Sequence, residues 1–367
     1  MNSFFSESAI SAVDLFCGVG GLTHGLIKGG VDVSAGVDVD DSCEYPYEAN
    51  NGARFIKADV AEMSSEDIVK LFEPGKVRLL AGCAPCQPFS TYSRKGRNKR
   101  YEEQWPLVKK FGSMVREIQP ELVTMENVPQ LVDHQVFNDF LDCLGGYCVW
   151  WNVIECERFG VPQTRKRLVL IASRLSAAGL ELKPTHNNPV SVRSVIGKLE
   201  SLAAGQASGA DPLHVASKLS SINLERIRAS KPGGTWRDWP KELQAQCHKK
   251  ATGATYPSVY GRMEWNKPAP TMTTQCFGYG NGRFGHPDQD RAISLREAAM
   301  LQTFPKKYKF AKREQEIVFS RLGRLIGNAV PVRLGQVIAQ ALVRHVEESK
   351  NNSNIKLPLN LNKDAIT

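Results

Sequence analysis

Long apolar runs are missing from this sequence of 367 residues. The runs that it has are short, as at Leu168–Ala172, whereas a helix that crosses a bilayer needs about 20 apolar residues. The segment Met1–Ile10 has no basic start, so we expect no signal peptide. A cysteine framework is missing too, because the nine cysteines are odd in number and scattered. They predict free thiols in a reducing cytosol. There is no internal repeat.

The composition is that of a folded protein with room for two domains. Hydrophobic residues make up 42% of the chain and charged residues 23%, which is typical of globular proteins rather than disordered ones. The length suffices for two ordinary domains or one large one. A formal net charge of +9 suits a polyanionic partner, but basicity of this size does not identify the partner by itself.

The first half of the chain alternates short apolar runs with helix-like segments. The runs are bounded by turn residues and are predicted as buried strands: Ser11–Phe16, Val31–Val37, Val77–Ala81, Leu122–Met125, Val149–Ile154 and Leu168–Ala172. The segments between them are predicted as helices: Leu22–Lys28, Asp41–Ala49, Ser65–Leu71, Leu107–Ile118 and Val136–Leu144. This alternation predicts an α/β fold with a mostly parallel sheet and helices on both faces.

The pattern changes after Ala172. The stretch from about His186 to Gly261 is loose, rich in Ser, Ala and Gly, and lacks a strand–helix rhythm, so it predicts a second, smaller domain of irregular structure. Strong patterning then returns, and a final helix is predicted to begin at Pro331, in its first turn, and to end near His345. The Asn- and Lys-rich segment that follows predicts a disordered tail.

A glycine-rich turn, Asp14–Gly21 (DLFCGVGG), follows the first predicted strand. Glycine is needed where the chain turns sharply and a ligand approaches its backbone. Asp38 ends the second strand, where a Rossmann-type fold places the carboxylate that accepts both ribose hydroxyls, and Asp59 follows the third strand-like run as a candidate acceptor for an adenine amino group. The motif alone predicts a nucleoside-bearing cofactor or a turn without a ligand. Against NAD, Thr23 stands in place of the third glycine of G-x-G-x-x-G.

A second turn follows a later strand at its carboxyl end, the edge at which open α/β sheets place their chemistry. It contains Cys83 and Cys86, which could be a redox pair, a nucleophile with an incidental neighbour, or half of a zinc site. A zinc site of this type needs a second C-x-x-C pair as ligands, and the sequence does not contain one. A redox pair would normally lie near the start of an oxidoreductase fold. Here a half-domain of the cofactor-binding type precedes the two cysteines. The pair alone leaves the choice open.

Taken in order, five blocks resemble the conserved blocks of the DNA cytosine-5 methyltransferases, and their order is far more specific than any one of them. They cover nearly all of residues 11–345: Asp14–Gly21, Pro85–Gln87, Glu126–Val128, Gln163–Arg167 and Gly327–Val330. The resemblance implies a large Rossmann-like domain that uses S-adenosylmethionine, a smaller target-recognition domain, and DNA between them. We place the catalytic domain at 1–185 plus 325–348, the recognition domain at 186–285, a hinge region at 286–324 and the tail at 349–367.

The resemblance also implies covalent catalysis on a flipped-out cytosine. A thiolate that adds to carbon-6 makes carbon-5 enamine-like and so divides one hard step into easier ones. Cys86 matches this nucleophile, and Glu126 matches the carboxyl group that meets the charge at ring nitrogen-3. Arg165 matches the residue that holds the cytosine carbonyl and the cysteine region. Arg167, two residues further on the same extended segment and facing the same way, is expected to support it.

The resemblance further implies which residues bind S-adenosylmethionine. Phe16 is expected to pack against the adenine, Asp38 to hold the ribose, Asp59 the adenine amino group and Asn328 the methionine end, while Leu107 lines the adenine pocket. The other expected cofactor residues are Gly18, Gly20, Gly21, Val39 and Pro85. Many relatives have an aromatic residue directly after the ribose-binding acid, so one face of the adenine is expected to be less covered here. No metal is expected.

A basic run, Arg94–Arg100 (RKGRNKR), follows the catalytic turn. Most charge runs are only solvated surface, but the family has a loop here that closes over DNA. A central glycine suits such a motion and the cations suit phosphates. The expected DNA contacts are Gln87, Ser90, Tyr92, Arg94, Lys95 and Arg97. Of these, Gln87 and Tyr92 are candidates to fill the space that the flipped base leaves.

Three other functions are possible. The RNA branch of the family methylates tRNA, but the wide irregular stretch at 186–261 favours a dedicated reader of DNA sequence. A NAD-dependent oxidoreductase is disfavoured by Thr23 and by the lack of a hydride-transfer site, and a catalytically dead DNA binder by intact Cys86, Glu126 and Arg165. We therefore expect a monomeric DNA (cytosine-5) methyltransferase of the bacterial restriction–modification type. It is expected in the cytoplasm, at the nucleoid, with duplex DNA and a separately acting restriction endonuclease as partners.

Overall fold

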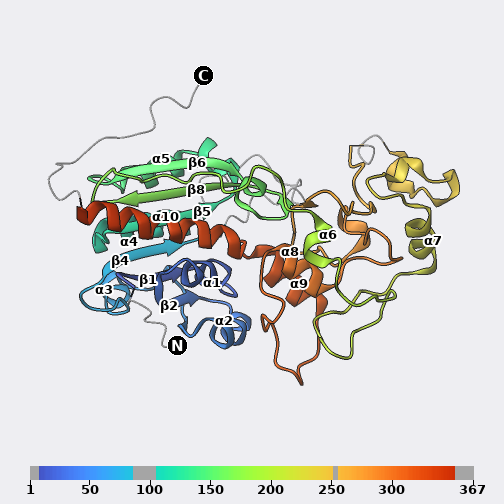
Figure 1. Cartoon of the computed structure of the whole chain (residues 1–367), viewed down its shortest axis with the longest axis horizontal. Helices are drawn as coiled ribbons and strands as arrows, with labels where there is room; N and C mark the ends of the chain where they lie inside the picture. The colour runs from blue at the N-terminus through green and yellow to red at the C-terminus, as the bar shows by residue number, and fades with distance from the viewer. Residues whose placement is uncertain (1–7, 86–104, 251–254, 352–367) are drawn as a thin grey trace. The chain divides into compact units, whose positions relative to one another are not determined.

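The computed structural model describes residues 8–85, 105–250 and 255–351 (Figure 1). Contacts within the chain divide it into two compact units. Unit 1 consists of Met1–Glu155, Lys166–Pro184 and Val332–Thr367, and unit 2 of Cys156–Arg165 and Thr185–Pro331. One division therefore falls beside the expected domain boundary at 185. Residues 156–165 and 325–331, which we had placed in the catalytic domain, belong to unit 2 instead.

Unit 1 is built on a seven-stranded sheet with the order β3-β2-β1-β4-β5-β8-β6 (Figure 1). Its strands are β1 (Ile10–Leu15), β2 (Asp32–Asp38), β3 (Arg54–Lys57), β4 (Val77–Gly82), β5 (Leu122–Asn127), β6 (Cys148–Glu155) and β8 (Lys166–Ser173). Neighbouring strands from β3 to β5 are parallel, whereas β8 runs antiparallel to both β5 and β6. The expected mostly parallel sheet is confirmed, with one antiparallel strand near its edge.

Helices cover both faces of this sheet. Successive side chains of a strand point to opposite faces, and every residue of β1 and of β5 is buried, so neither face is open to solvent. The helices of unit 1 are α1 (Gly21–Lys28), α2 (Glu44–Asn51), α3 (Ser65–Val69), α4 (Pro106–Ile118), α5 (Gln135–Asp142) and α10 (Val332–Asn351). Side chains of α4 and α5 share one core with those of β1, β4 and β5. The blue helix α1 and the red helix α10, from opposite ends of the chain, pack together (Figure 1).

The last helix differs from the prediction at both ends. It begins at Val332, one residue after Pro331, and it runs to Asn351 instead of ending near His345. The extra turn is held because the Ser349 hydroxyl donates to the His345 carbonyl at 2.8 Å. The expectation of a tail that starts at residue 349 is therefore wrong for its first three residues, while residues 352–367 lie outside the described part of the chain.

Unit 2 has little regular structure, as the loose pattern of residues 186–261 predicted. Its strands and helices are short: β7 (Gln163–Thr164), β9 (Ala269–Pro270), α6 (Val192–Ile196), α7 (Ser221–Ala229), α8 (Leu295–Leu301) and α9 (Phe319–Asn328). Strands β7 and β9 pair in parallel, and isolated bridges such as that between Arg262 and Gly285 join the loops. Most of the unit is therefore held by contacts other than a sheet.

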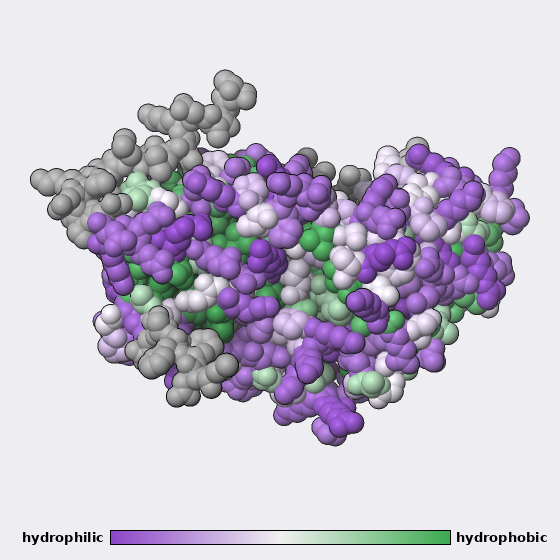
Figure 2. All heavy atoms as spheres, viewed as in Figure 1, coloured by the Kyte–Doolittle hydropathy of each residue, from purple (hydrophilic) through white to green (hydrophobic). Residues whose placement is uncertain are grey.

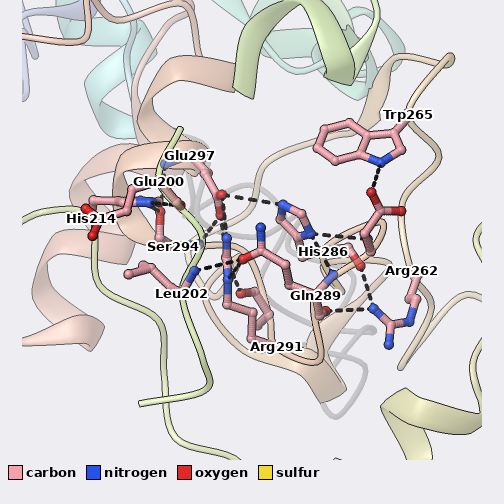
Figure 3. Close-up of polar contacts among 12 residues, drawn as sticks. Glu200, Leu202, His214, Arg262, Trp265, His286, Gln289, Arg291, Ser294 and Glu297 are labelled. Atoms are coloured by element: carbon pink, nitrogen blue, oxygen red, sulfur yellow. Dashed lines mark hydrogen bonds and ion pairs between the residues drawn. The ribbon is translucent and has the colours of Figure 1, made fainter. Parts of the chain in front are cut away.

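A buried polar network provides these contacts (Figure 3). Arg291 is fully buried, and its two terminal nitrogens donate to the two carboxylate oxygens of Glu297 at 2.7 Å each. Glu297 also accepts from the backbone N–H of Ser294 at 2.6 Å and closes the capping box of α8. The His286 ring lies 3.7 Å from the same carboxylate, but burial lowers the pKa of His286 to about 4, so the ring is neutral at pH 7. The charge of Arg291 is thus balanced by Glu297.

A second arginine extends the network (Figure 3). Arg262 donates to the backbone carbonyls of His286 at 2.9 Å and Gln289 at 2.6 Å, and it forms an ion pair with Asp290. The side chain of Gln289 in turn accepts from Nε of Arg291 at 2.8 Å. Two buried arginines therefore tie together loops that no strand connects.

Removing the charge of Glu297 should destabilise unit 2. Breaking a buried ion pair by removing one partner leaves the other charge uncompensated, at a cost of about 3–5 kcal/mol. We expect Glu297→Gln to lower the free energy of unfolding by about that amount in urea titrations. Glu314→Gln, at an exposed carboxylate of the same unit, should change it by less than about 0.5 kcal/mol. Equal unfolding midpoints for the two variants would contradict the role given to the network.

Hydrophilic side chains cover most of the molecular face shown in Figure 2, with smaller apolar areas between them. Large exposed hydrophobic residues do occur among the described residues, and Val39, at 65% exposure, is the most exposed of those identified. No helix in the described ranges is long and apolar enough to cross a membrane.

Candidate active site

The turn after β1 has the backbone of a ligand cradle. Phe16, Gly18 and Gly20 have φ angles of 60°, 51° and 83°. Glycine adopts this left-handed region freely, whereas a bulky residue such as Phe16 is strained there, and strain of this kind gathers at ligand sites. Gly20 is also the N-cap of α1, so the first N–H groups of that helix lie next to the turn. The turn therefore combines an aromatic ring, a left-handed backbone and a helix N-terminus.

Asp38 closes this turn from the end of β2. Its two carboxylate oxygens accept from the backbone N–H groups of Gly18 at 2.8 Å and Asp40 at 2.9 Å. Burial raises the pKa of Asp38, and these two N–H groups act against that rise. Each carboxylate oxygen has a further lone pair, so Asp38 can still accept from hydroxyl groups of a ligand. Asp59 lies exposed just after β3, the parallel neighbour of β2, at the same edge of the sheet.

Thr23 has a structural role that the sequence did not reveal. Its hydroxyl donates to Asp14 at 2.6 Å and lies 3.1 Å from the Tyr47 hydroxyl, so it ties the end of β1 to α2 beneath the glycine turn. Asp14 is fully buried, and burial raises its pKa to about 7. The sequence showed only that Thr23 replaces the third glycine of a NAD-binding motif. In the structure it anchors the turn itself.

The other predicted cofactor residues of unit 1 lie at or near the same sheet edge. Gly21 is the first residue of α1, and Val39 directly follows Asp38 with its side chain exposed. Pro85 is exposed three residues after β4, and Leu107 is half-buried in the first turn of α4. Asn328 is exposed at the last residue of α9 and belongs to unit 2, so its expected contact with the cofactor stays a prediction.

Glu126 is the centre of the second cluster. It is buried near the end of β5, and its carboxylate lies between side chains from the two flanking strands. The thiol of Cys83, just after β4, donates to Oε2 at 2.9 Å. The Nε of Arg167, at the start of β8, lies 2.9 Å from Oε1 in an ion pair without hydrogen-bond geometry. The strand order β4-β5-β8 therefore assembles a thiol, a carboxylate and a guanidinium at one edge.

Asn127 fixes the chain next to this cluster. Its amide nitrogen donates to the Ala84 carbonyl at 3.2 Å, and its amide oxygen accepts from the Val128 backbone at 2.8 Å. The side chain is almost fully buried, so these bonds do not compete with water. Asn127 thus holds the segment two residues before Cys86 against the end of β5.

Cys83 itself is a free thiol, and its setting does not suit a nucleophile. Burial, and then the negative charge of Glu126, raise the pKa of Cys83 well above its usual value, so it stays protonated at neutral pH. Nucleophiles and zinc ligands both need the thiolate. Cys86 and the expected DNA contacts lie outside the described residues: Gln87, Ser90, Tyr92, Arg94, Lys95 and Arg97. Their roles stay predictions.

The two arginines of the fourth block have different surroundings. Arg165 is buried in unit 2, and its Nη1 donates to the Met272 carbonyl at 3.1 Å. We expected Arg165 and Arg167 on one strand, but Arg165 precedes β8 and only Arg167 belongs to it. Arg167 is the arginine that meets Glu126, a more direct part than the supporting one that the sequence suggested. Whether Arg165 meets the catalytic turn stays a prediction.

Two buried glutamines connect further blocks within unit 2. Gln163 donates to the side chain of Gln302 at 2.8 Å, and Gln302 donates to the Ile326 carbonyl at 2.8 Å. Next to it, a Cβ on Gly327 would lie 2.3 Å from the Thr273 carbonyl, so only glycine fits there. The role of Gln302 was not predicted, because no local sequence pattern shows that a glutamine is buried before its distant partners are known.

Known proteins resemble this chain along nearly its whole length. Residues 10–344 match the family model described as C-5 cytosine-specific DNA methylase. The Type II methylase M.HgiDII of Herpetosiphon aurantiacus is 50% identical over 354 residues, covering 95% of this chain and 99% of that protein. The Type II methyltransferase M1.HphI of Haemophilus parahaemolyticus is 29% identical, covering 92% and 87%.

Solved structures share the fold. A putative DNA modification methyltransferase encoded within an E. coli prophage superposes with a TM-score of 0.70 at 22% identity, covering 92% of this chain and 99% of that one. The methyltransferase EhMeth of Entamoeba histolytica superposes with a TM-score of 0.63 at 14% identity, covering 92% and 98%. At these identities the likeness concerns the fold alone.

Proposed function

This chain belongs to the family of C-5 cytosine-specific DNA methylases, and we propose that it methylates a flipped-out cytosine in duplex DNA through a covalent adduct with Cys86. The observation that carries the proposal is the carboxylate of Glu126, buried between Cys83 and Arg167 at the carboxyl end of β4. A base inside the duplex stack exposes neither face of its ring, so the cytosine has to leave the stack before Cys86 can add to it.

The chemistry divides between two side chains. Cys86 adds as thiolate to carbon-6, the ring loses its aromaticity, and electron density moves towards nitrogen-3 and carbon-5. Glu126 supplies a proton at nitrogen-3, so that the ring does not carry the full negative charge. After methylation, a solvent base takes the carbon-5 proton, Cys86 leaves as thiolate, and nitrogen-3 returns its proton to Glu126, which restores the aromatic ring. The guanidinium of Arg167 lies 2.9 Å from Oε1 and faces the Glu126 carboxyl group in an ion pair.

S-adenosylmethionine fits the cradle in unit 1 and supplies an electrophilic methyl group when bound. Phe16 offers a ring beside the turn, and the carboxylate of Asp38 has lone pairs free for two ribose hydroxyls. Asp59, exposed at the same sheet edge, suits an adenine amino group. Asn328, from unit 2, is assigned to the methionine end by the family resemblance alone.

Asp38→Asn should weaken the binding of S-adenosylmethionine. An amide has one acceptor oxygen where the carboxylate has two, so we expect the Kd, measured by calorimetry, to rise at least about 10-fold. Asp41→Asn is the matched control, because the contact described for the Asp41 side chain is an exposed ion pair with Lys57, and such pairs contribute little. Equal Kd values for the two variants would contradict the assignment of the ribose site.

Sequence choice and biological role follow from the family. The proposed reader is residues 186–285, with 286–324 as hinge, both within unit 2, where irregular loops on a buried polar frame can present varied side chains to bases. Two relatives are named Type II enzymes. We accordingly assign this enzyme to a restriction–modification system, in which it protects DNA from a separately acting endonuclease.

The direct test supplies labelled S-adenosylmethionine to the purified protein with duplex DNA or tRNA. Label should enter duplex DNA, and methylation mapping of plasmid from expressing cells should find 5-methylcytosine within one short sequence. Label in tRNA alone would favour the RNA-modifying branch of the family. No label in either substrate, from protein that binds the cofactor, would contradict the proposed activity.

A further inference from the structure

We propose that Cys83 is a positioning residue for Glu126, whose thiol holds the carboxyl group in its working orientation at the cytosine site. The inference rests on the proposed function and goes beyond it, because it gives a role to the cysteine that the chemistry does not consume. Its basis is the thiol-to-Oε2 contact of 2.9 Å between the ends of two adjacent strands.

The backbone fixes where this thiol lies. Gly82 pairs with Met125 in the parallel register of β4 and β5, so the next residues along, Cys83 and Glu126, lie side by side. The Cys83 backbone N–H donates to the Leu15 carbonyl at 3.3 Å, which holds β4's end against β1 as well. A side chain at position 83 therefore meets Glu126 without any local rearrangement.

Glu126 needs such a donor. Its side chain is 4% exposed, and a buried carboxylate with an unsatisfied oxygen costs considerable free energy. Arg167 compensates the charge at Oε1, but its N–H does not point along a hydrogen bond. Among the described contacts of Oε2, the hydrogen bond is the one from Cys83. Without it the carboxyl group can rotate about its last bond, and its oxygens lose their fixed directions.

A thiol suits this place better than a stronger donor. Burial raises the pKa of Cys83, so the thiol keeps its proton and can donate at neutral pH. An S–H group is also a weak donor, so it can give up Oε2 to an N–H of the incoming base at small cost. The thiol thus holds the carboxyl group while the site is empty and yields when the substrate arrives.

The test compares Cys83→Ala, which removes the donor, with Cys83→Ser, which keeps one. In single-turnover methylation of duplex DNA we expect the alanine variant to be roughly 10-fold slower and the serine variant within about 3-fold of wild type. The Kd values for DNA and S-adenosylmethionine should stay within about 2-fold of wild type, since the hydrogen bond orients an acid rather than binding either ligand. Cys143→Ala, at a half-buried thiol that donates to the Asp139 carbonyl within α5, is the matched control.

A double-mutant cycle separates positioning from general packing. If Cys83 acts through Glu126, then Cys83→Ala should cost less than about 2-fold in a Glu126→Gln background, because the group that it orients is already inactive. A full 10-fold loss in that background would overturn the proposal, and so would equal losses in Cys83→Ala and Cys83→Ser. Failure of the proposed function would look different: wild type would transfer no methyl group, or Glu126→Gln would retain full activity.

Discussion

Cys86→Ser is expected to abolish methyl transfer, with a loss on the order of 10⁴-fold or more, while the binding of S-adenosylmethionine stays close to wild type. A serine hydroxyl holds its proton at neutral pH, so it presents almost no anion to carbon-6, and without that addition carbon-5 stays unreactive. The measurement is the single-turnover rate constant with labelled cofactor and cognate duplex. The cofactor Kd, measured by calorimetry, reports whether the fold is intact.

The control for this variant is Cys143→Ser, which changes another thiol of unit 1 and should keep the wild-type rate, since Cys143 is the C-cap residue of α5 and its thiol donates to the Asp139 carbonyl of that helix. Two results would contradict the assignment. One is turnover by Cys86→Ser within about 10-fold of wild type. The other is a proportional loss of cofactor binding, which would make Cys86 a structural residue.

Glu126→Gln is expected to slow the chemical step roughly 10²–10³-fold and to change the Kd for duplex DNA by less than about 3-fold. Glutamine has the same shape but cannot supply a proton at nitrogen-3 as charge develops there. Rate and affinity are measured separately, by single turnover and by equilibrium binding. A large loss of rate with a small loss of DNA affinity indicates a group that acts in the transition state.

The matched control is Glu155→Gln. Glu155 also lies at the end of a strand and pairs with a cation, Lys166 at 3.0 Å, but both side chains are exposed, and such pairs contribute little. It should keep nearly the full rate. If Glu126→Gln loses rate and DNA affinity by the same factor, Glu126 holds the structure or the DNA and does not act on the ring.

Much of unit 1 could be predicted because its signals are local. Short apolar runs bounded by turn residues mark buried strands, and β1, β4 and β5 were found within two residues of their predicted ends. The end of the last helix was missed because a hydrogen bond between Ser349 and the carbonyl of His345 extends it through a polar segment. Apolar periodicity does not register such a bond.

The contacts of the site were harder to predict because they join residues that are remote in sequence. Resemblance identified Glu126 and Arg167, but only the order β4-β5-β8 shows that they meet, and that Cys83 meets Glu126 from the other side. In unit 2 the frame consists of polar pairs such as Arg262 with Asp290. A polar residue is expected at the surface until its buried partner is known. The sequence therefore contains no local pattern that predicts these buried polar pairs.

Trapping of the covalent adduct is the most direct measurement of the central claim. After Cys86 adds to carbon-6 and the methyl group arrives, the enzyme is released only when carbon-5 loses its hydrogen as a proton. Fluorine at that position cannot leave as a cation, so duplex DNA with 5-fluorocytosine at the target should form a complex that survives denaturant. The account predicts that this complex requires S-adenosylmethionine and maps to a peptide with modified Cys86. No complex with a verified target sequence, or modification at Cys83 instead, would contradict it.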